Sequence, residues 1–439
     1  MRTAMSTVVA ALLATGSALL PAAGQTPHTE RVSTASDGAQ ADLGGDGAAI
    51  SANGRVVAFT SEATNLVPGD TNGQADVFVR DLRTGRTERV SVASDGTQGD
   101  SYSYGPSLSA NGRYVAFASH AATLVPGDDN EATDVFVHDR RTGRTERVTA
   151  GGGPGARDSD NPVLSADGRY VAFSSARDDL VPGDTNGVND IFRRDRRAGT
   201  TERVSVRSDG AQGTGASRVD PVISADGRRV GFVSRSNLVP AAETDHGPGD
   251  PRRPRLYFMY VRDVPTGRTM VASATSTGEP VGASAIALSP DGRYALFSAL
   301  SANVVPGDHN GEMDVFARNL GTGAVARVNV AHDGTEATGG DSTQAVFSAD
   351  NRRVLFVSGA TNLVPGDTGG VQDAFARDLR TGAVERLSAP HDDSAPSGYG
   401  PGSVALDAAG RTAVFDADGD NLVPGDTNGR PDVFVRRLR

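Results

Sequence analysis

The sequence predicts an all-β fold, a seven-bladed β-propeller with four antiparallel strands in each blade. Three observations support this prediction. A unit of about 58 residues recurs seven times. Each unit carries the turn signals of short hairpins, and the two chain ends carry complementary parts of one unit. One apolar position is common to all units and is occupied by Phe59, Phe117, Phe173, Phe232, Phe297, Phe356 and Phe415.

The first two strands of each unit are predicted from a turn between apolar segments. The first strand is short, as in 106–109 or 162–165, and is followed by a turn such as Asn53-Gly54 or Asp167-Gly168. Asn-Gly and Asp-Gly favour hairpins because both central positions of the turn need a positive φ. The second strand, 114–119 in the second unit, is apolar on both faces, as expected for a strand between neighbouring sheets.

The third and fourth strands follow from the second half of the unit. Residues 76–80 are largely apolar, and a Thr-Gly turn at 84–85 separates them from 87–91. The segment 87–91 alternates polar and apolar residues and therefore suits an outer edge. Four antiparallel strands repeated seven times describe a β-propeller.

The chain ends predict how the ring closes. The seventh unit stops after its third strand, at 432–437, and has no fourth strand. The segment 29–33 reads T-E-R-V-S, which is the fourth strand of other units. We therefore expect 29–33 to pair beside 432–437 and complete the last blade.

The N-terminus resembles a secretory signal. Arg2 precedes an apolar stretch over 8–20, and small residues at 22–24 form a cleavage site. The stretch is shorter than the roughly 18 residues that span a membrane. We expect a signal peptide at 1–24, a secreted or cell-envelope protein, and one propeller over 25–439. The expected blades cover about 45–93, 104–150, 160–206, 219–273, 283–330, 342–389, and 402–438 with 29–33.

Composition excludes several kinds of chemistry. The chain has no Cys and no Lys, so it has no disulfide, thiol nucleophile, Schiff-base lysine or P-loop lysine. A formal charge of −11 argues against nucleic acid or an anionic membrane surface as a partner. Cations are the expected small partners, and a monomer is the expected state.

An acidic motif, P-G-D-x-N-G-x-x-D, lies in the loop between the second and third strands. Oxygen ligands at this spacing in a Gly-containing turn suit Ca²⁺. Asp and Asn also stabilise turns without any metal, so a purely structural role stays open. The candidate calcium ligands are Asp70, Asn72, Asp76, Asp128, Asn130, Asp134, Asp184, Asn186, Asp190, Asp308, Asn310, Asp314, Asp367, Asp373, Asp426, Asn428 and Asp432.

The fourth unit replaces this loop with an insertion over 241–255, rich in Pro, Gly and charge. It breaks the sevenfold symmetry on the face that carries the acidic loops. The sequence leaves two interpretations open, a tolerated insertion and a partner-binding loop. For the second, the candidate binding residues are His246, Asp250, Arg252, Arg253 and Arg255.

The segments S-x-D-G-R-x-x-x-F-x-S and D-V-F-x-R-D resemble the PD40 or TolB-like class of WD40-related propeller repeats, over residues 29–439. The resemblance implies a protein-binding scaffold of the periplasm or cell surface, or a propeller that gates substrates for a peptidase domain. The Trp-Asp dipeptide of true WD40 repeats is missing, as is every other Trp.

The catalytic motifs of common hydrolases are missing. The sequence has no G-x-S-x-G elbow and no H-E-x-x-H, and its seven histidines are scattered. We therefore expect a non-catalytic scaffold for a protein or surface ligand, with calcium as a candidate ion. The alternative is a cation-assisted hydrolase or lyase acting on an extracellular polymer, because paired carboxylates are plentiful.

Overall fold

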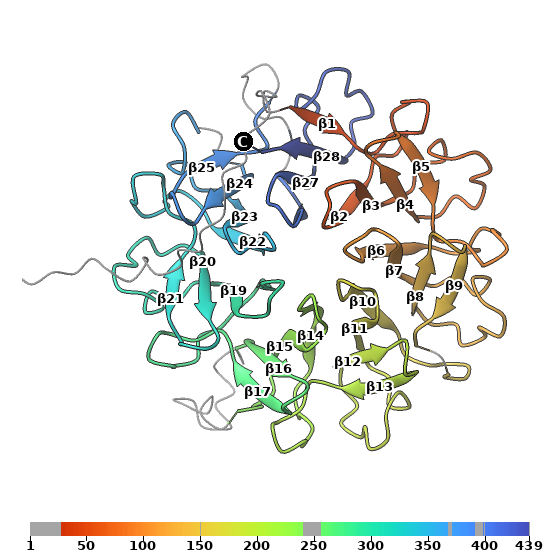
Figure 1. Cartoon of the computed structure of the whole chain (residues 1–439), viewed down its shortest axis with the longest axis horizontal. Helices are drawn as coiled ribbons and strands as arrows, with labels where there is room; N and C mark the ends of the chain where they lie inside the picture. The colour runs from red at the N-terminus through yellow and green to blue at the C-terminus, as the bar shows by residue number, and fades with distance from the viewer. Residues whose placement is uncertain are drawn as a thin grey trace, which may run out of the picture.

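The computed structural model describes residues 28–149, 151–239, 256–367, 371–390, 398 and 400–438. Over these residues the regular secondary structure is β-strand, arranged as seven four-stranded antiparallel sheets. The sheets stand around a central channel like the blades of a propeller (Figure 1). The predicted fold class is confirmed.

The strands run from the channel outward in the order of the sequence within blades 1 to 6. Their bounds are β2 Asp46–Ile50, β3 Val56–Ser61, β4 Asp76–Asp81 and β5 Arg86–Arg89 in blade 1; β6 Ser103–Leu108, β7 Tyr114–Ser119, β8 Asp134–Asp139 and β9 Arg144–Arg147 in blade 2; β10 Ser159–Leu164, β11 Tyr170–Ser175, β12 Asp190–Asp195 and β13 Thr200–Arg203 in blade 3; β14 Ser217–Ile223, β15 Arg229–Ser234, β16 Phe258–Asp263 and β17 Arg268–Val271 in blade 4; β18 Ile286–Leu288, β19 Tyr294–Ala299, β20 Asp314–Asn319 and β21 Val325–Arg327 in blade 5; β22 Ser342–Phe347, β23 Arg353–Ser358, β24 Asp373–Asp378 and β25 Val384–Arg386 in blade 6.

Blade 7 is shared between the two ends of the chain, as predicted. It contains β26 Val404–Leu406, β27 Thr412–Ala417, β28 Asp432–Arg437 and the N-terminal β1 Thr29–Arg31. β1 pairs antiparallel with β28, with Glu30 opposite Val435. The first strand of the chain is therefore the outer strand of the last blade.

The first strands of blades 2 and 3 are longer than the sequence predicted, whereas those of blades 5 and 7 have three residues each. β6 begins at Ser103 rather than at Pro106, and its pairing with β7 shifts register between Tyr104 and Ser107. Gly105 has φ 62° at this bulge. A bulge leaves a residue outside the hydrogen-bond ladder, so it accommodates a proline that has no N–H. The bulge also interrupts the alternation by which a strand is recognised in a sequence.

The core lies within and between the blades and is built on pairs of aromatic rings. In blade 1, Phe59 of β3 lies opposite Phe78 of β4, with ring centroids 5.9 Å apart and both side chains fully buried. Equivalent pairs occupy the other blades, with Tyr260 replacing one Phe in blade 4. Each buried ring contributes about 1.5–3 kcal/mol to stability. The repeated Phe of the sequence is thus a packing residue.

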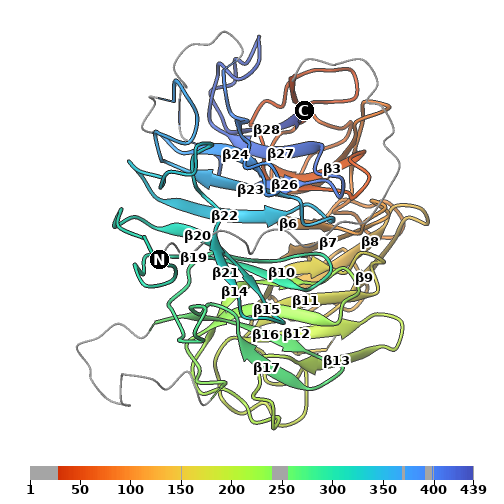
Figure 2. The same cartoon turned by 60° about the vertical axis from the view of Figure 1, so that its left-hand side comes forward.

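The antiparallel strand order gives the molecule two different faces. We call loop face the side that carries the loops between second and third strands and the loops between blades. We call turn face the side that carries the turns between first and second and between third and fourth strands. Figure 2 shows the ring of blades obliquely, turned by 60° from the view of Figure 1. In the described part of the chain, no helix is long and apolar enough to span a membrane.

Candidate functional site

Each acidic loop of the sequence motif contains two carboxylates with an arginine of the same blade between them. In blade 1, Asp76 begins β4 and is fully buried, and Asp70 precedes it in the loop. Arg89 of β5 places Nη1 3.1 Å from Asp70 Oδ1 and 3.2 Å from Asp76 Oδ2. The arginine of the T-E-R-V-S segment therefore balances part of the charge that a cation would neutralise.

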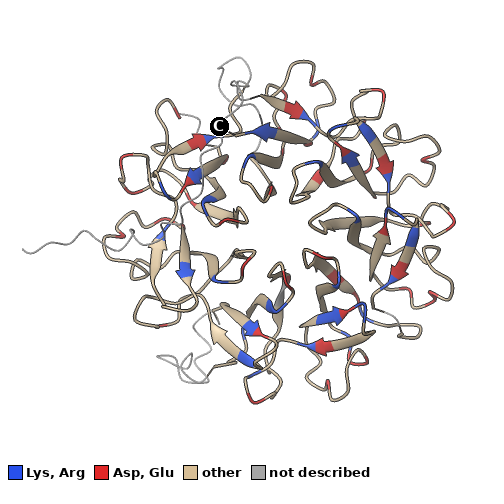
Figure 3. Ribbon diagram, in the orientation of Figure 1, with Lys and Arg blue, Asp and Glu red and all other residues tan. Residues whose placement is uncertain are grey.

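The same arrangement recurs in five further blades. The arginine and its two carboxylates are Arg147 with Asp128 and Asp134, Arg203 with Asp184 and Asp190, Arg327 with Asp308 and Asp314, Arg386 with Asp367 and Asp373, and Arg31 with Asp426 and Asp432. Acidic and basic residues accordingly recur at equivalent places from blade to blade (Figure 3).

Blade 4 lacks the carboxylate and the arginine together. Phe258 occupies the position of Asp76, since it pairs with the last residue of the second strand. Val271 occupies the position of Arg89, opposite the aromatic residue of the third strand. A buried charge left without its partner is costly. Joint loss of both groups indicates that they act as one unit.

The middle Asn of the motif stabilises the turn through hydrogen bonds. Asn72 Oδ1 accepts a hydrogen bond from Gln74 N at 3.0 Å, and its amide donates to Gly99 O at 2.9 Å. In four other blades the amide donates to the second carboxylate of the motif, from Asn130, Asn186, Asn310 and Asn428. These hydrogen bonds are the ones expected if the Asp and Asn residues of the motif stabilise the turn without a metal, the interpretation that the sequence left open.

Blade 5 differs from the others in its charge. Blades 1 and 7 place a Gln beside the acidic pair, and Gln98 Nε2 donates to Asp70 Oδ1 at 2.9 Å. Blade 5 has Glu336 at this position. Asp308, Asp314 and Glu336 bring carboxylate oxygens within 4.8 Å of one another, while Arg327 lies 2.5 Å from Glu336. Of the acidic loops, this one has the donor set best suited to a cation.

Burial changes the pKa of several motif carboxylates. Desolvation raises the pKa of Asp432 to about 6, against the hydrogen bond from Ser33. Desolvation likewise raises the pKa of Asp128 to about 6, against the charge of Arg147. The negative charge of these groups is therefore only partly offset by their partners.

The candidate binding residues of blade 4, His246, Asp250, Arg252, Arg253 and Arg255, lie outside the described residues, as does the expected signal peptide.

Sequence reasoning missed an aromatic cluster at the inner rim of the loop face. Tyr102 stacks on His120 with ring centroids 5.4 Å apart and on Tyr104 at 5.9 Å. The Tyr104 hydroxyl donates to Asp160 of blade 3. The Tyr-Ser-Tyr run at 102–104 was the sequence feature that could have indicated this cluster.

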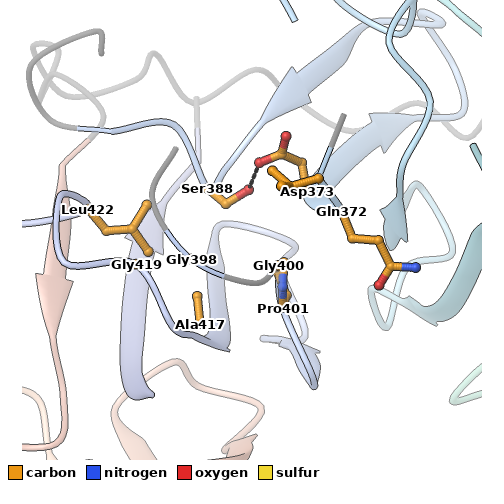
Figure 4. Close-up of a pocket in the computed structure, with 10 residues that line it drawn as sticks. Gln372, Asp373, Ser388, Gly398, Gly400, Pro401, Ala417, Gly419 and Leu422 are labelled. Carbon is orange, nitrogen blue, oxygen red and sulfur yellow. Dashed lines mark hydrogen bonds between the residues drawn. The ribbon is translucent and has the colours of Figure 1, made fainter. Parts of the chain in front are cut away.

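Two hollows on the loop face involve blade 7. One, of about 470 Å³, is lined by Asp46, Asp416 and Asp418 among others. Desolvation, then repulsion from Asp416 and Glu62, raises the pKa of Asp46. The other lies between blades 6 and 7, where Ser388 donates to Asp373 at 2.5 Å (Figure 4).

The loop face also carries the exposed apolar side chains. Among the described residues the exposed large hydrophobic side chains are Leu43, Tyr102, Leu256 and Leu300. Leu43 and Tyr102 precede first strands, and Leu256 and Leu300 lie between second and third strands. All four therefore lie on the loop face, and Leu300 is 63% exposed.

Charge is divided between the two faces. On the described part of the loop face, the exposed acids are Asp37, Asp42, Asp46, Glu62, Asp95, Asp100, Asp129, Glu131, Asp158, Asp178, Asp179, Asp209, Glu279, Asp333, Asp341 and Asp420, against the exposed Arg157, Arg235 and Arg430. In the turns of the other face, the exposed arginines are Arg55, Arg83, Arg141, Arg197, Arg228, Arg293, Arg352, Arg380 and Arg411, against the exposed Asp167, Asp226, Asp291 and Asp350.

Comparison with known proteins supports the fold. No protein-family model and no curated protein matches the chain. The chain is similar to an oligogalacturonate lyase from Vibrio parahaemolyticus, at 11% identity over 94% of this chain and 93% of that chain, with a TM-score of 0.53. It is also similar to the β-propeller domain of the Trilobed protease from Pyrococcus furiosus, at 11% identity over 90% and 94% of the two chains, with a TM-score of 0.51.

The chain has the β-propeller fold. A putative TolB from Agrobacterium tumefaciens also matches, at 16% identity over 82% and 96% of the two chains, with a TM-score of 0.42. The propeller of seven four-stranded blades is consistent with the resemblance of its repeat to TolB-like propellers. At these identities the similarity is one of fold, and one fold hosts many functions.

Proposed function

We propose that this propeller is an exported, non-catalytic scaffold whose loop face binds a protein or surface ligand. One observation carries the proposal: the exposed large apolar side chains of the described residues all lie on the loop face. Protein interfaces use such side chains as anchors, surrounded by polar groups. Leu300 and Tyr102 are two such anchors, set among exposed carboxylates.

The acidic loops support a scaffold more than a catalytic site. An active site needs different groups from different elements, held around one point. Here the loops repeat one unit, two carboxylates with an arginine between them. Calcium remains a candidate ion, and the loop of blade 5 is the place we assign to it, because Glu336 adds a third carboxylate.

The test is a photo-crosslinking amino acid placed at one position of each face in the full chain. We expect position 300 of the loop face to give one specific adduct with a protein of the producing cell, and position 84 of the turn face to give none. In a second variant that carries the crosslinker at position 300 together with Tyr102→Ser, the adduct should be abolished. Adducts that are equal from both positions, or that survive this substitution, would contradict the proposal.

A cation-assisted hydrolase or lyase is the second candidate, favoured by the hollow beside Asp46 and Asp416. A carboxyl with a raised pKa is suited to proton transfer near neutral pH. Release of new reducing ends or unsaturated products from an acidic or neutral polysaccharide, lost in Asp46→Asn, would establish this function. Product release that is unchanged in that variant would reject the hollow as the site.

A further inference from the structure

The turn face presents arginine side chains that the protein itself does not pair. Every turn between first and second strands ends in an arginine, from Arg55 in blade 1 to Arg411 in blade 7. Turns between third and fourth strands add Arg83, Arg141 and Arg197 in blades 1 to 3. Five of these side chains are exposed and, within the described residues, make no ion pair or hydrogen bond: Arg55, Arg83, Arg141, Arg197 and Arg411.

The local carboxylates hold the backbone of the turn and form no ion pair with these arginines. Asp81 Oδ1 accepts from Arg83 N at 2.9 Å and from Thr84 N at 2.8 Å. Against its partial desolvation, these hydrogen bonds and the nearby charge of Arg83 lower the pKa of Asp81. Asp195 accepts from the backbone of Arg197 in the same way. The turn is thus stabilised by its aspartate, and the arginine side chain extends from it into solvent.

Other arginines of this face are paired and show the contrast. Arg113 donates to both oxygens of Asp139, and Arg169 donates to Asp195. These pairs join the inner turn to the end of the third strand of the same blade. They are structural contacts, so the unpaired arginines on blade 7 and blades 1 to 3 are the ones available to a ligand.

We propose that the turn face binds a planar anionic surface of phospholipid headgroups. Guanidinium groups pair readily with phosphate oxygens. The unpaired arginines occupy both the inner turns, near the channel, and the outer turns of adjacent blades, so they spread over an area (Figure 1). A linear polymer would be expected to contact a single row of arginines and not arginines spread over an area. None of the exposed large apolar side chains of the described residues lies here, which disfavours a protein interface.

The net charge of the chain does not oppose this binding. The formal charge of −11 is concentrated elsewhere, because the exposed acids gather on the loop face. Exposed charges separated by more than a Debye length of about 8 Å are largely screened at physiological ionic strength. Binding through the turn face would also leave the loop face free for the partner of the proposed function.

The test uses the full chain in vesicle flotation. Vesicles of phosphatidylcholine with phosphatidylglycerol are compared with vesicles of phosphatidylcholine alone, at low and high salt. We expect binding to the anionic vesicles only, weakening with salt. Arg83→Gln with Arg141→Gln should weaken it about 30-fold, given about 1 kcal/mol per arginine near an anionic membrane. Arg157→Gln with Arg430→Gln on the loop face is the matched control and should change binding less than roughly 2-fold.

Three outcomes would overturn the proposal. The first is equal binding to neutral and anionic vesicles. The second is equal weakening by the turn-face and loop-face variants. The third is binding to soluble polyphosphate or to an acidic polysaccharide without binding to anionic vesicles. Unchanged thermal midpoints of the two variants would show that both remain folded.

Discussion

The hydroxyl of Ser33 donates a hydrogen bond to the carboxylate of Asp432 across a sequence separation of 399 residues. Arg31, two residues earlier, lies 3.5 Å from the same carboxylate and 3.4 Å from Asp426. These contacts and the pairing of β1 with β28 close the ring. The contact that forms the acidic unit of blade 7 is therefore also the contact that joins the two chain ends.

Arg31→Ala should destabilise the whole ring. It leaves two buried carboxylates without their cation, and loss of one partner of a buried pair costs about 3–5 kcal/mol. Urea unfolding of the full chain measures this loss. Arg83→Ala, an exposed and unpaired arginine, is the control and should stay within about 0.5 kcal/mol of the wild type. Equal effects would show that closure does not depend on Arg31.

Asp76 and Arg89 should act as one unit, as their joint replacement in blade 4 indicates. Asp76→Ala and Arg89→Ala should each be strongly destabilising, because each leaves an unpaired buried charge. The double variant should lose less than the sum, with a coupling of about 0.5–3 kcal/mol. A double-mutant cycle from denaturant unfolding provides the value. Strict additivity would contradict the pairing.

The raised pKa of Asp432 predicts a pH dependence of stability. The folded state holds this proton up to about pH 6, whereas the unfolded state releases it near the ordinary carboxyl pKa of 3.8. The folded state therefore binds more protons in this window, and the free energy of unfolding falls as pH rises from about 4 to about 6. Asp432→Asn should reduce this fall, and urea midpoints across the window measure it. A slope identical to the wild type would contradict the assignment.

Gly168→Ala should disturb the contact between blades 2 and 3. Gly168 has φ +70°, and an added Cβ would lie 2.4 Å from the ring of Tyr114. Tyr114 also packs between Arg113 and Arg196, at 4.6 Å from each guanidinium carbon. We expect a loss of about 1–3 kcal/mol beyond the backbone strain. Gly127→Ala has a similar φ of +74° with open space around it, so it measures the strain alone.

The repeat made most of the fold predictable, and it made less of the site predictable. The recurring Phe59 position and the T-E-R-V-S segment at 29–33 determine the blades and their closure, because both are read directly from the period. The position of Arg89 between Asp70 and Asp76 depends on how the third and fourth strands pair, which the period does not show. The absence of both the carboxylate and the arginine from blade 4 is the sequence feature that could have indicated this pairing. The Tyr102 and His120 cluster depends on two loops meeting, which a single sequence does not reveal.

Calcium binding tests most simply whether arginines of the chain neutralise the acidic pairs of the loops. The measurement is the thermal midpoint of the full chain with excess calcium and after exhaustive chelation, for the wild type, Glu336→Gln and Gln98→Glu. Glu336→Gln gives blade 5 the donor set of blade 1, and Gln98→Glu does the reverse. A ligand that binds the native state raises its stability, by about 2.7 kcal/mol at a hundredfold excess over Kd. We predict that any calcium-dependent rise is lost in Glu336→Gln and enhanced in Gln98→Glu. A rise that persists undiminished in Glu336→Gln would contradict it, because calcium would then bind the loops whose charge we assign to arginine.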